Sequence, residues 1–426
     1  MDEFLSWIQE KYSNIILSYY KTGKDYTKDI IYKIDFLHID SKSTFNLVLS
    51  SSKKENEKEL RIIRKALLEL NDCNIFLFNL KDFLNFIPGN FDLISKIYDL
   101  QLFLSLERKD QDELFFEKEL SCEEIKSLIS KIHINELYDI LISTSLNFSK
   151  MEKSFLPSGG KKLFSYYKIY GTVSGRMTNE HLSDNFINVL NHPRNERNII
   201  KAPQDYKIIN VDYNAMEMRV LGFLSQDDCL NYIFDNDKDI YIVIGQFILG
   251  KADIDEDTRQ MIKELCFLII YGGTKYGFSS KMNISLEDAE NLIQKFMESF
   301  PKVEEWILKT QIDILEKGYT ESLTGRKRIL NLENQEAACR QGQNFKIQSL
   351  ANDVMLMAIN ELNDNLLSNS KIILNVFDSL CILSPENSVN GNIEIIRDIM
   401  EKPKKLQEFG IDMKLKPVFN ISDFWE

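Results

Sequence analysis

Two aspartates stand in or beside strongly apolar stretches of this 426-residue sequence. Asp212 follows the apolar residues Ile208 and Ile209, and Asp378 lies inside the apolar stretch 371–383. Burying an unpaired carboxylate is costly, but Asp also favours the turn of a hairpin. Two carboxylates that converge repel each other unless a cation lies between them, and Mg²⁺ accepts such oxygen ligands. Asp378 is therefore either a plain turn residue, or its hairpin turn and the end of the first strand bring Asp378 and Asp212 together as a metal site.

A second candidate site is the helical pattern TRQMIKELCFLIIYGG, residues 258–273. Arg259, Lys263, Phe267 and Tyr271 follow one another at steps of four and so share one helix face. Two cations suit the phosphates of a nucleotide, and an aromatic ring can stack on its base. The alternative is an ordinary amphipathic helix with a snorkelling basic end.

The elements that must position these residues are two strands and a set of helices. The strand-like stretches are 206–212 and 371–383, and long helical patterns occupy the interval between them, including 255–271, 285–299 and 335–366. Two strands separated by so many helical residues predict one sheet with a large helical insertion.

The first part of the chain has a different pattern. Residues 28–50 and 73–80 contain clustered β-formers on either side of the helical pattern 58–70. This predicts a small α/β domain that ends near residue 108. Residues 109–152 are charged and helical in pattern, and a glycine loop at 157–162 follows them.

Composition excludes several classes of protein. The sequence is 44% hydrophobic and 27% charged, which is ordinary for a soluble globular protein. It has no membrane-length apolar run and no export signal at its start, so we expect a cytoplasmic protein without a membrane partner. Six scattered cysteines and four histidines do not suit disulfides or a zinc site. A net charge of −13 excludes a uniformly basic surface but allows a local basic groove.

Taken together and in order, the motifs resemble those of the family A DNA polymerases, the Klenow-like group. The resemblance covers roughly residues 165–385 and rests on the ordered set rather than on any one motif. The matching segments are YGTVSGRMT (170–178), VDYNAMEMRVL (211–221), RQMIKELCFLIIYGGTKYGF (259–278), AACRQGQNFKIQSLAND (337–353) and NVFDSLCI (375–382).

The resemblance implies an α+β protein with the right-hand polymerase fold: a palm sheet, helical fingers and a short helical thumb. Residues 166–426 would form the palm and fingers, with the fingers at about 223–335. Residues 109–165 would form a reduced thumb, and 1–108 a small α/β exonuclease-like domain. The implied activity is template-directed addition of dNTPs to a primer 3′-hydroxyl by two-metal phosphoryl transfer.

The resemblance also assigns the metal site. Asp212 and Asp378 correspond to the metal-binding carboxylates, and Tyr213 is placed at the metal site beside them. Two Mg²⁺ ions are implied, with Mn²⁺ as the alternative ion. Lys263 is a candidate proton donor to the leaving pyrophosphate.

In the nucleotide site, Arg259 and Lys263 match the triphosphate contacts. Phe267 matches the residue that packs on the incoming sugar and base, and Tyr271 the ring behind the nascent pair. Glu217 matches the steric gate that excludes a ribose 2′-hydroxyl.

The primer–template contacts follow in the same way. Arg176, Arg340, Asn344 and Gln348 match residues that read the minor groove near the primer end or contact the template. Phe377 occupies the position of the histidine in the usual His-Asp-Glu motif, and it cannot donate that histidine's hydrogen bond. We therefore expect weaker sensing of the primer terminus.

Two further departures from the family bear on function. Ser379 replaces the glutamate of His-Asp-Glu, and in this respect the motif is similar to that of the single-subunit phage RNA polymerases. Glu217 argues against a ribonucleotide polymerase, because such an enzyme has no use for a steric gate. Residues 74–105 faintly resemble the second motif of the proofreading exonuclease, yet no Asp-x-Glu precedes them, and Phe83 stands where an aspartate is needed. We expect an exonuclease-like domain without activity.

Two other classes remain open: an RNA polymerase or template-independent nucleotidyltransferase, and a catalytically silent nucleic-acid-binding scaffold. The expected partners are primer–template DNA and dNTPs. Because the thumb is short, a processivity factor or a helicase–primase is a further candidate. Basic residues at 159–162, 196–201 and 325–328 are candidates for phosphate contacts. The small size predicts a phage, plasmid or other mobile element in a bacterial host.

Overall fold

The structure is a computed structural model that describes most of the chain. The residues outside the described part are 9–13, 27, 40, 42, 69, 71–72, 87–95, 100, 102–106, 110–119, 130–135, 154–155, 158–162, 170 and 235–238. The glycine loop, much of the expected thumb and part of the exonuclease-like segment therefore lie outside it.

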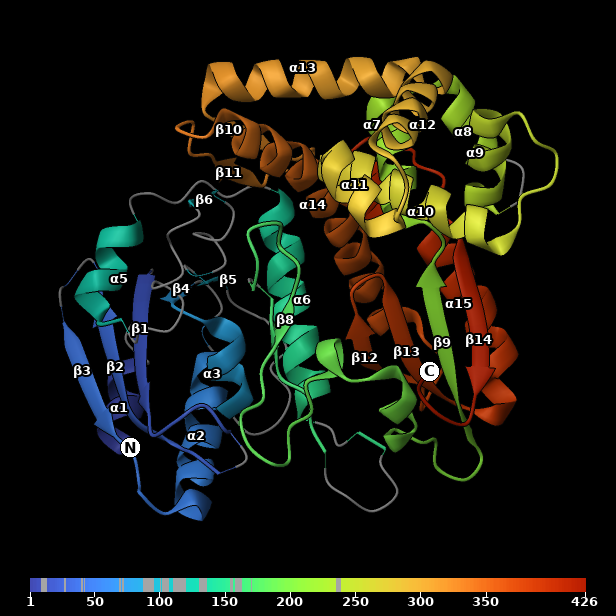
Figure 1. Ribbon diagram of the computed structural model, residues 1–426. Helices are drawn as coiled ribbons and strands as arrows, with labels where there is room; N and C mark the ends of the chain where they lie inside the picture. The colour runs from blue at the N-terminus through green and yellow to red at the C-terminus, as the bar shows by residue number, and fades with distance from the viewer. Residues whose placement is uncertain are drawn as a thin grey trace.

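A five-stranded mixed sheet forms the N-terminal part of the protein (Figure 1). Its strands, in spatial order, are β3 (Thr44–Val48), β2 (Ile31–His38), β1 (Asn14–Lys21), β4 (Asn74–Leu77) and β5 (Lys96–Asp99). Strand β2 runs antiparallel to both β3 and β1, whereas β4 runs parallel to both β1 and β5. The associated helices are α1 (Asp2–Ile8), α2 (Lys53–Leu68), α3 (Leu80–Phe86) and α5 (Cys122–Ile129).

The predicted strands and helix of this region match β2, β3, β4 and α2. Strand β1 was missed, and its burial explains why. Residues 15–19 are all buried, so the strand lacks the alternation of polar and apolar residues that marks a half-buried strand. Ile16 packs toward α5, against Ile125, while Ile15 and Leu17 belong to the main core.

A four-stranded antiparallel sheet forms the palm. Its strands, in spatial order, are β12 (Lys371–Val376), β13 (Ser379–Pro385), β9 (Tyr206–Tyr213) and β14 (Pro417–Ser422), followed or flanked by α15 (Val389–Glu401) and α16 (Lys404–Glu408). The expected single sheet with a helical insertion is present. The apolar stretch 371–383, however, is two strands joined by a turn at Phe377 and Asp378.

The insertion is the helical lobe at the top of Figure 1. It contains α7 (Met216–Ser225), α8 (Asp228–Phe234), α9 (Ile240–Leu249), α10 (Glu256–Tyr271), α11 (Lys275–Met282), α12 (Leu286–Ser299), α13 (Pro301–Lys317), β10 (Tyr319–Glu321), β11 (Lys327–Ile329) and α14 (Gln335–Asn365). The three predicted helical patterns correspond to α10, α12 and α14 within two residues at each end.

Helix α14 connects this lobe with the palm and with α6 (Glu136–Glu152). The side-chain amide of Asn147 donates to the Asn360 side chain at 2.9 Å, and Asn360 donates to the Ile140 carbonyl at 3.0 Å. The short strand β6 (Glu107–Lys109) runs parallel to β11 and so joins the N-terminal part to the lobe. The remaining short elements are β7 (Tyr167–Lys168), β8 (Thr178–Asn179), η2 (Val189–Asn191), η3 (Arg194–Ile199) and η4 (Glu386–Ser388).

Within the described part of the chain, no helix combines the length and the apolar character needed to cross a membrane.

Candidate active site

The two aspartates lie side by side at one end of the palm sheet. In the register of β9 with β13, Asp212 pairs with Ser379, the residue after Asp378. One residue further along β9, the Tyr213 amide donates to the Asp378 carbonyl at 3.1 Å and holds Asp378 beside the end of this strand. The hairpin turn that presents Asp378 holds Phe377 at a φ of 56°, a left-handed conformation that is costly for a bulky residue. Asp378 is thus both a turn residue and a neighbour of Asp212.

Both carboxylates have raised pKa values, and the causes are local. The walls of the site shield Asp212 from water and Asp378 repels its charge, which together raise the pKa of Asp212 to about 7. Loss of water and the nearby charge of Glu217 raise the pKa of Asp378 as well. The positive charge of Lys263 lowers the pKa of both carboxyl groups. This is a site with excess negative charge that a cation would relieve.

The donor chemistry of this pair fits a divalent cation, because carboxylate oxygens are hard ligands. Among the described residues, no group of three or more His, Cys, Asp or Glu side chains could hold a metal. Water and substrate phosphate would therefore have to supply further ligands, as is usual for Mg²⁺. The Tyr213 hydroxyl is not one of them, since it is buried and donates to the Met400 carbonyl at 2.9 Å.

Helix α10 turns its cationic and aromatic face toward the aspartates. Arg259, Lys263, Phe267 and Tyr271 all line one cavity of about 520 Å³ together with Asp212 and Asp378. The helix begins where the Asp255 side chain accepts from the Thr258 amide and ends at a glycine with a φ of 62°. Its opposite face is buried core, which fixes the rotation of the helix. Because the four side chains are spaced four residues apart on α10, they together form one wall of the cavity.

Glu217 is the centre of a polar cluster in the same cavity. The Tyr271 hydroxyl donates to both Glu217 oxygens, at 3.2 and 3.0 Å. The Arg176 guanidinium forms an ion pair with Glu217 at 2.5 Å and lies 5.9 Å from the centre of the Phe377 ring. Burial and the Glu217 charge raise the pKa of Tyr271, so its hydroxyl stays a donor. Arg176 and Phe377, both expected near the primer end, thus line the cavity of Asp212 and Asp378 as well.

The Arg259 guanidinium is already engaged in this structure. Its Nε and one terminal nitrogen donate to the Asp239 carboxylate at 3.0 and 2.8 Å. A triphosphate could reach it only by sharing or replacing that carboxylate. Lys263, by contrast, forms no ion pair within the described part of the chain, and its Nζ lies 5.8 Å from the Tyr241 ring centre.

Tyr241 was missed by the sequence analysis. It lines the cavity from α9, and both Arg259 and Lys263 lie over its ring. Its surrounding sequence, IYIVIGQFIL, looks like buried core, so nothing in the pattern distinguishes this ring. Arg219, two residues after Glu217 on α7, is buried, and its guanidinium donates to the carbonyls of Asn214 and Lys414, which gives it a structural role.

The three predicted template or primer residues on α14 do not line this cavity. Arg340, Asn344 and Gln348 follow one another at steps of four along α14 and are half-buried. A Cβ placed on Gly272, which ends α10, would come within 2.9 Å of the Arg340 side chain. The buried Asn344 oxygen has no hydrogen-bond partner among the described residues. The structure thus places Arg340, the first residue of this row, beside the end of α10.

A second cavity, of about 490 Å³, also borders the carboxylates. It shares Asp212, Phe377 and Asp378 with the first cavity and adds Arg194 and Asn210. Arg194 is exposed, and its charge lowers the pKa of Asp212. No specific sequence pattern distinguishes Arg194, because it is one of several cations in a polar segment.

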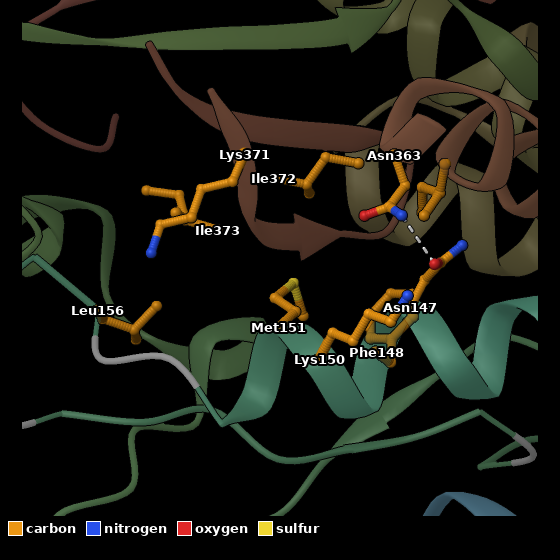
Figure 2. Close-up of a pocket in the computed structure, with 10 residues that line it drawn as sticks. Asn147, Phe148, Lys150, Met151, Leu156, Asn363, Lys371, Ile372 and Ile373 are labelled. Atoms are coloured by element: carbon orange, nitrogen blue, oxygen red, sulfur yellow. Dashed lines mark hydrogen bonds between the residues drawn. The ribbon is translucent and has the colours of Figure 1, made fainter. Parts of the chain in front are cut away.

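A smaller cavity of about 170 Å³ lies away from the aspartates (Figure 2). It separates α6 from β12 and is lined by apolar residues such as Met151 and Ile372, with Lys150 and Lys371 also lining it. The side chains of Asn363 and Asn147 are hydrogen-bonded at 2.9 Å on one side of it. This cavity belongs to the packing between α6 and the palm rather than to the carboxylate site.

The basic segments expected to contact phosphate differ in their availability. Arg326 is buried and bound to the Asp353 carboxylate, so it is structural and that part of the expectation is wrong. Arg197 lies over the Trp425 ring at 4.6 Å. The lysines at 161 and 162 lie outside the described part of the chain.

Known proteins resemble this chain in sequence and in fold. A family model described as DNA polymerase family A matches residues 118–426. The chain belongs to DNA polymerase family A. Among curated relatives of this polymerase family, the sequence is 29% identical to a thermostable DNA polymerase I of Thermus filiformis over 54% of this chain. It is 31% identical to DNA polymerase I of Borreliella burgdorferi, also over 54% of this chain. These matches span 28% and 27% of the relatives' own lengths.

The fold is that of a family A polymerase domain. The structure matches the POL domain of Pol1 from M. smegmatis, solved with DNA primer–template and dNTP, with a TM-score of 0.81. The match covers 99% of this chain and 98% of that one at 15% sequence identity. This confirms the α+β right-hand fold.

Proposed function

We propose that this family A member is a template-directed DNA polymerase that adds dNTPs to a primer 3′-hydroxyl without proofreading. One observation carries the proposal: Asp212 and Asp378 share a cavity with the cationic and aromatic face of α10. A cavity with two acids at one side and two cations on a facing helix suits a metal-bound triphosphate. Replication is the proposed setting, and an origin in a phage, plasmid or other mobile element stays a prediction.

The residues divide the work of phosphoryl transfer between them. Asp212 and Asp378 would hold two Mg²⁺ ions, which supply activation of the attacking hydroxyl and neutralisation of the triphosphate. Lys263 brings a positive charge near both acids and could pass a proton to the leaving pyrophosphate. Arg259 binds the outer phosphates after exchange with Asp239. Phe267 orients the incoming base.

The deciding experiment is extension of a labelled primer–template duplex in Mg²⁺ with dNTPs, with rNTPs, and with the template omitted. Template-ordered addition of dNTPs supports the proposal. Preference for rNTPs, or addition without template, would instead identify an RNA polymerase or a template-independent nucleotidyltransferase. Binding to DNA without incorporation would identify a scaffold.

Glu217 is expected to select the sugar. Glu217→Ala should raise incorporation of rNTPs relative to dNTPs by about 10- to 200-fold, because it opens the space that a 2′-hydroxyl would need. Single-turnover kcat/KM for matched dNTP and rNTP pairs measures the ratio. Tyr271→Phe is the matched control, since it removes the hydrogen bond to Glu217 but leaves the carboxylate and its Arg176 partner. A ratio unchanged in Glu217→Ala would contradict the assignment.

We also propose that the N-terminal part lacks proofreading activity. Phe83 fills the position where the exonuclease needs an acid, and it is buried against the Tyr19 ring at 5.1 Å. Its neighbour Asp82 is buried and accepts from the hydroxyls of Tyr19 and Tyr166 at 3.0 and 3.2 Å, besides an ion pair with Lys21. An acid so fully engaged is a poor metal ligand.

This proposal predicts no Mg²⁺-dependent degradation of a 5′-labelled single strand, even over long incubations. The assay is best done with the Asp378→Asn variant, so that resynthesis or pyrophosphorolysis by the polymerase site cannot mask the result. Shortening of the strand by that variant would show a second, active metal site.

The proposed ligands are primer–template DNA and dNTPs. The expected domain limits, the reduced thumb and the need for a processivity factor or a helicase–primase remain predictions. Run-length measurement with a trapped primer, with and without candidate factors, would test them.

A further inference from the structure

Helix α13 carries exposed apolar side chains along its outer face. Leu308, Ile312 and Leu315 are 55%, 57% and 37% exposed. Steps of four and three residues place them in one stripe along the helix. The helix lies at the outside of the lobe, across the top of the molecule in Figure 1. We call these three residues the α13 stripe.

In the described part of the chain, α13 packs through the opposite face of the helix. Val303, Ile307 and Ile314 are buried on that face, where α13 packs against α14 and α7. A helix that needed only this packing would be polar on its solvent side. The neighbouring helix α12 follows that rule, with Leu286 in its first turn as its one large apolar residue in the exposed class. The α13 stripe is therefore not explained by packing against the residues that the structure describes.

The charges beside the stripe indicate what covers it. Lys309 and Glu316 are exposed and lie on the same side of the stripe, two helical turns apart. At about 10.5 Å of separation along the axis they cannot pair with each other. Neither forms an ion pair with any other residue in the described part of the chain. On a second α13 running in the opposite direction, a lysine of one helix would face a glutamate of the other, twice.

We propose that α13 pairs antiparallel with α13 of a second copy of this chain to form a weak homodimer. Ile312 packs against Leu315 of the partner subunit, and the reverse contact follows from the twofold axis. Lys309 pairs with Glu316 of the partner subunit on each side of this apolar centre. A different partner protein would not require complementary charges at reversed positions of the same helix, whereas a twofold dimer does.

A single pair of helices buries less surface than a standard stable interface, so the dimer is concentration-dependent. None of its residues lines the cavity of Asp212 and Asp378. The interaction can therefore be tested without reference to the polymerase activity.

Sedimentation velocity over a range of protein concentrations tests the proposal on the full chain. The unaltered protein should shift from monomer toward dimer as concentration rises, and Ile312→Asp should stay monomeric. Leu286→Ser is the matched control, because it removes an exposed apolar residue from α12 and should leave the equilibrium unchanged. Circular dichroism and primer extension verify that each variant is folded.

Charge exchange identifies the partner as a second copy in this register. Lys309→Glu and Glu316→Lys should each weaken the dimer about tenfold, since each turns two attractions into repulsions. The double variant should return to within about twofold of the original dissociation constant, because both pairs are restored with reversed sign. A monomer at every concentration, a dimer that survives Ile312→Asp, or a double variant as weak as the single ones would each overturn the proposal.

Discussion

Asp378→Asn is expected to lower template-ordered dNTP addition by about a thousandfold or more, equivalent to about 4 kcal/mol of transition-state stabilisation. Asparagine has the size and turn preference of aspartate, so the hairpin at Phe377 should keep its shape. What is lost is one negative charge at the site that would hold the metal ions. Pre-steady-state incorporation of a single dNTP measures the effect.

The same substitution should not reduce the stability of the fold. Asp212 and Asp378 repel each other, as the raised pKa of Asp212 indicates. Removal of one charge relieves that repulsion, so the free energy of unfolding should stay equal or rise. This separates loss of chemistry from loss of structure. Asp398→Asn, an exposed site on α15, is the control and should change neither quantity. A variant that still extends primers at near-normal rates would remove Asp378 from the reaction.

Much of the candidate site could be predicted because its residues are close in sequence and fall at helical spacing. The four side chains of α10 share a face whatever the surrounding fold, since the period of the helix alone brings them together. The meeting of Asp212 with Asp378 needed more: two strands far apart in sequence had to pair in one register. The ordered resemblance to a polymerase supplied that link.

Other contacts could not be predicted from local patterns. The ion pair between Arg176 and Glu217 joins a loop to the start of α7, and no spacing rule connects residues 41 positions apart. Strand β14 was also not predicted, although it pairs with β9 and contributes Val418 to the lining of both cavities. It is a short edge strand with exposed residues, so it lacks the apolar character that identifies a core strand.

A buried ion pair between distant residues also could not be predicted from local patterns. Its disruption is the second substitution with a large expected effect. Lys81 on α3 donates to both oxygens of Glu152 at the end of α6, at 2.9 and 2.8 Å, and both side chains are almost fully buried. Glu152 also accepts from the Asn85 side chain at 2.7 Å and from the Tyr167 amide at 2.6 Å. The Lys81 ammonium lies 4.0 Å from the Tyr166 ring centre. This cluster connects the N-terminal part to α6 and to the segment that leads into the palm.

Lys81→Met should therefore destabilise the fold by about 3 to 5 kcal/mol, because it leaves the Glu152 carboxylate buried without its counter-charge. Loss of water already raises the pKa of Glu152 and lowers that of Lys81, so each charge depends on the other. Urea unfolding followed by circular dichroism measures the change in the transition that includes α3 and α6.

The double variant Lys81→Met with Glu152→Gln separates the cost of an orphaned charge from the value of the pair. Glutamine keeps an oxygen for the Asn85 amide and the Tyr167 amide, and no net charge remains buried. Exchanging a buried ion pair for neutral groups of similar volume is often close to neutral, so the double variant should recover most of the lost stability. If the double variant is instead no more stable than Lys81→Met alone, the ion pair itself holds the N-terminal part against α6 and the palm.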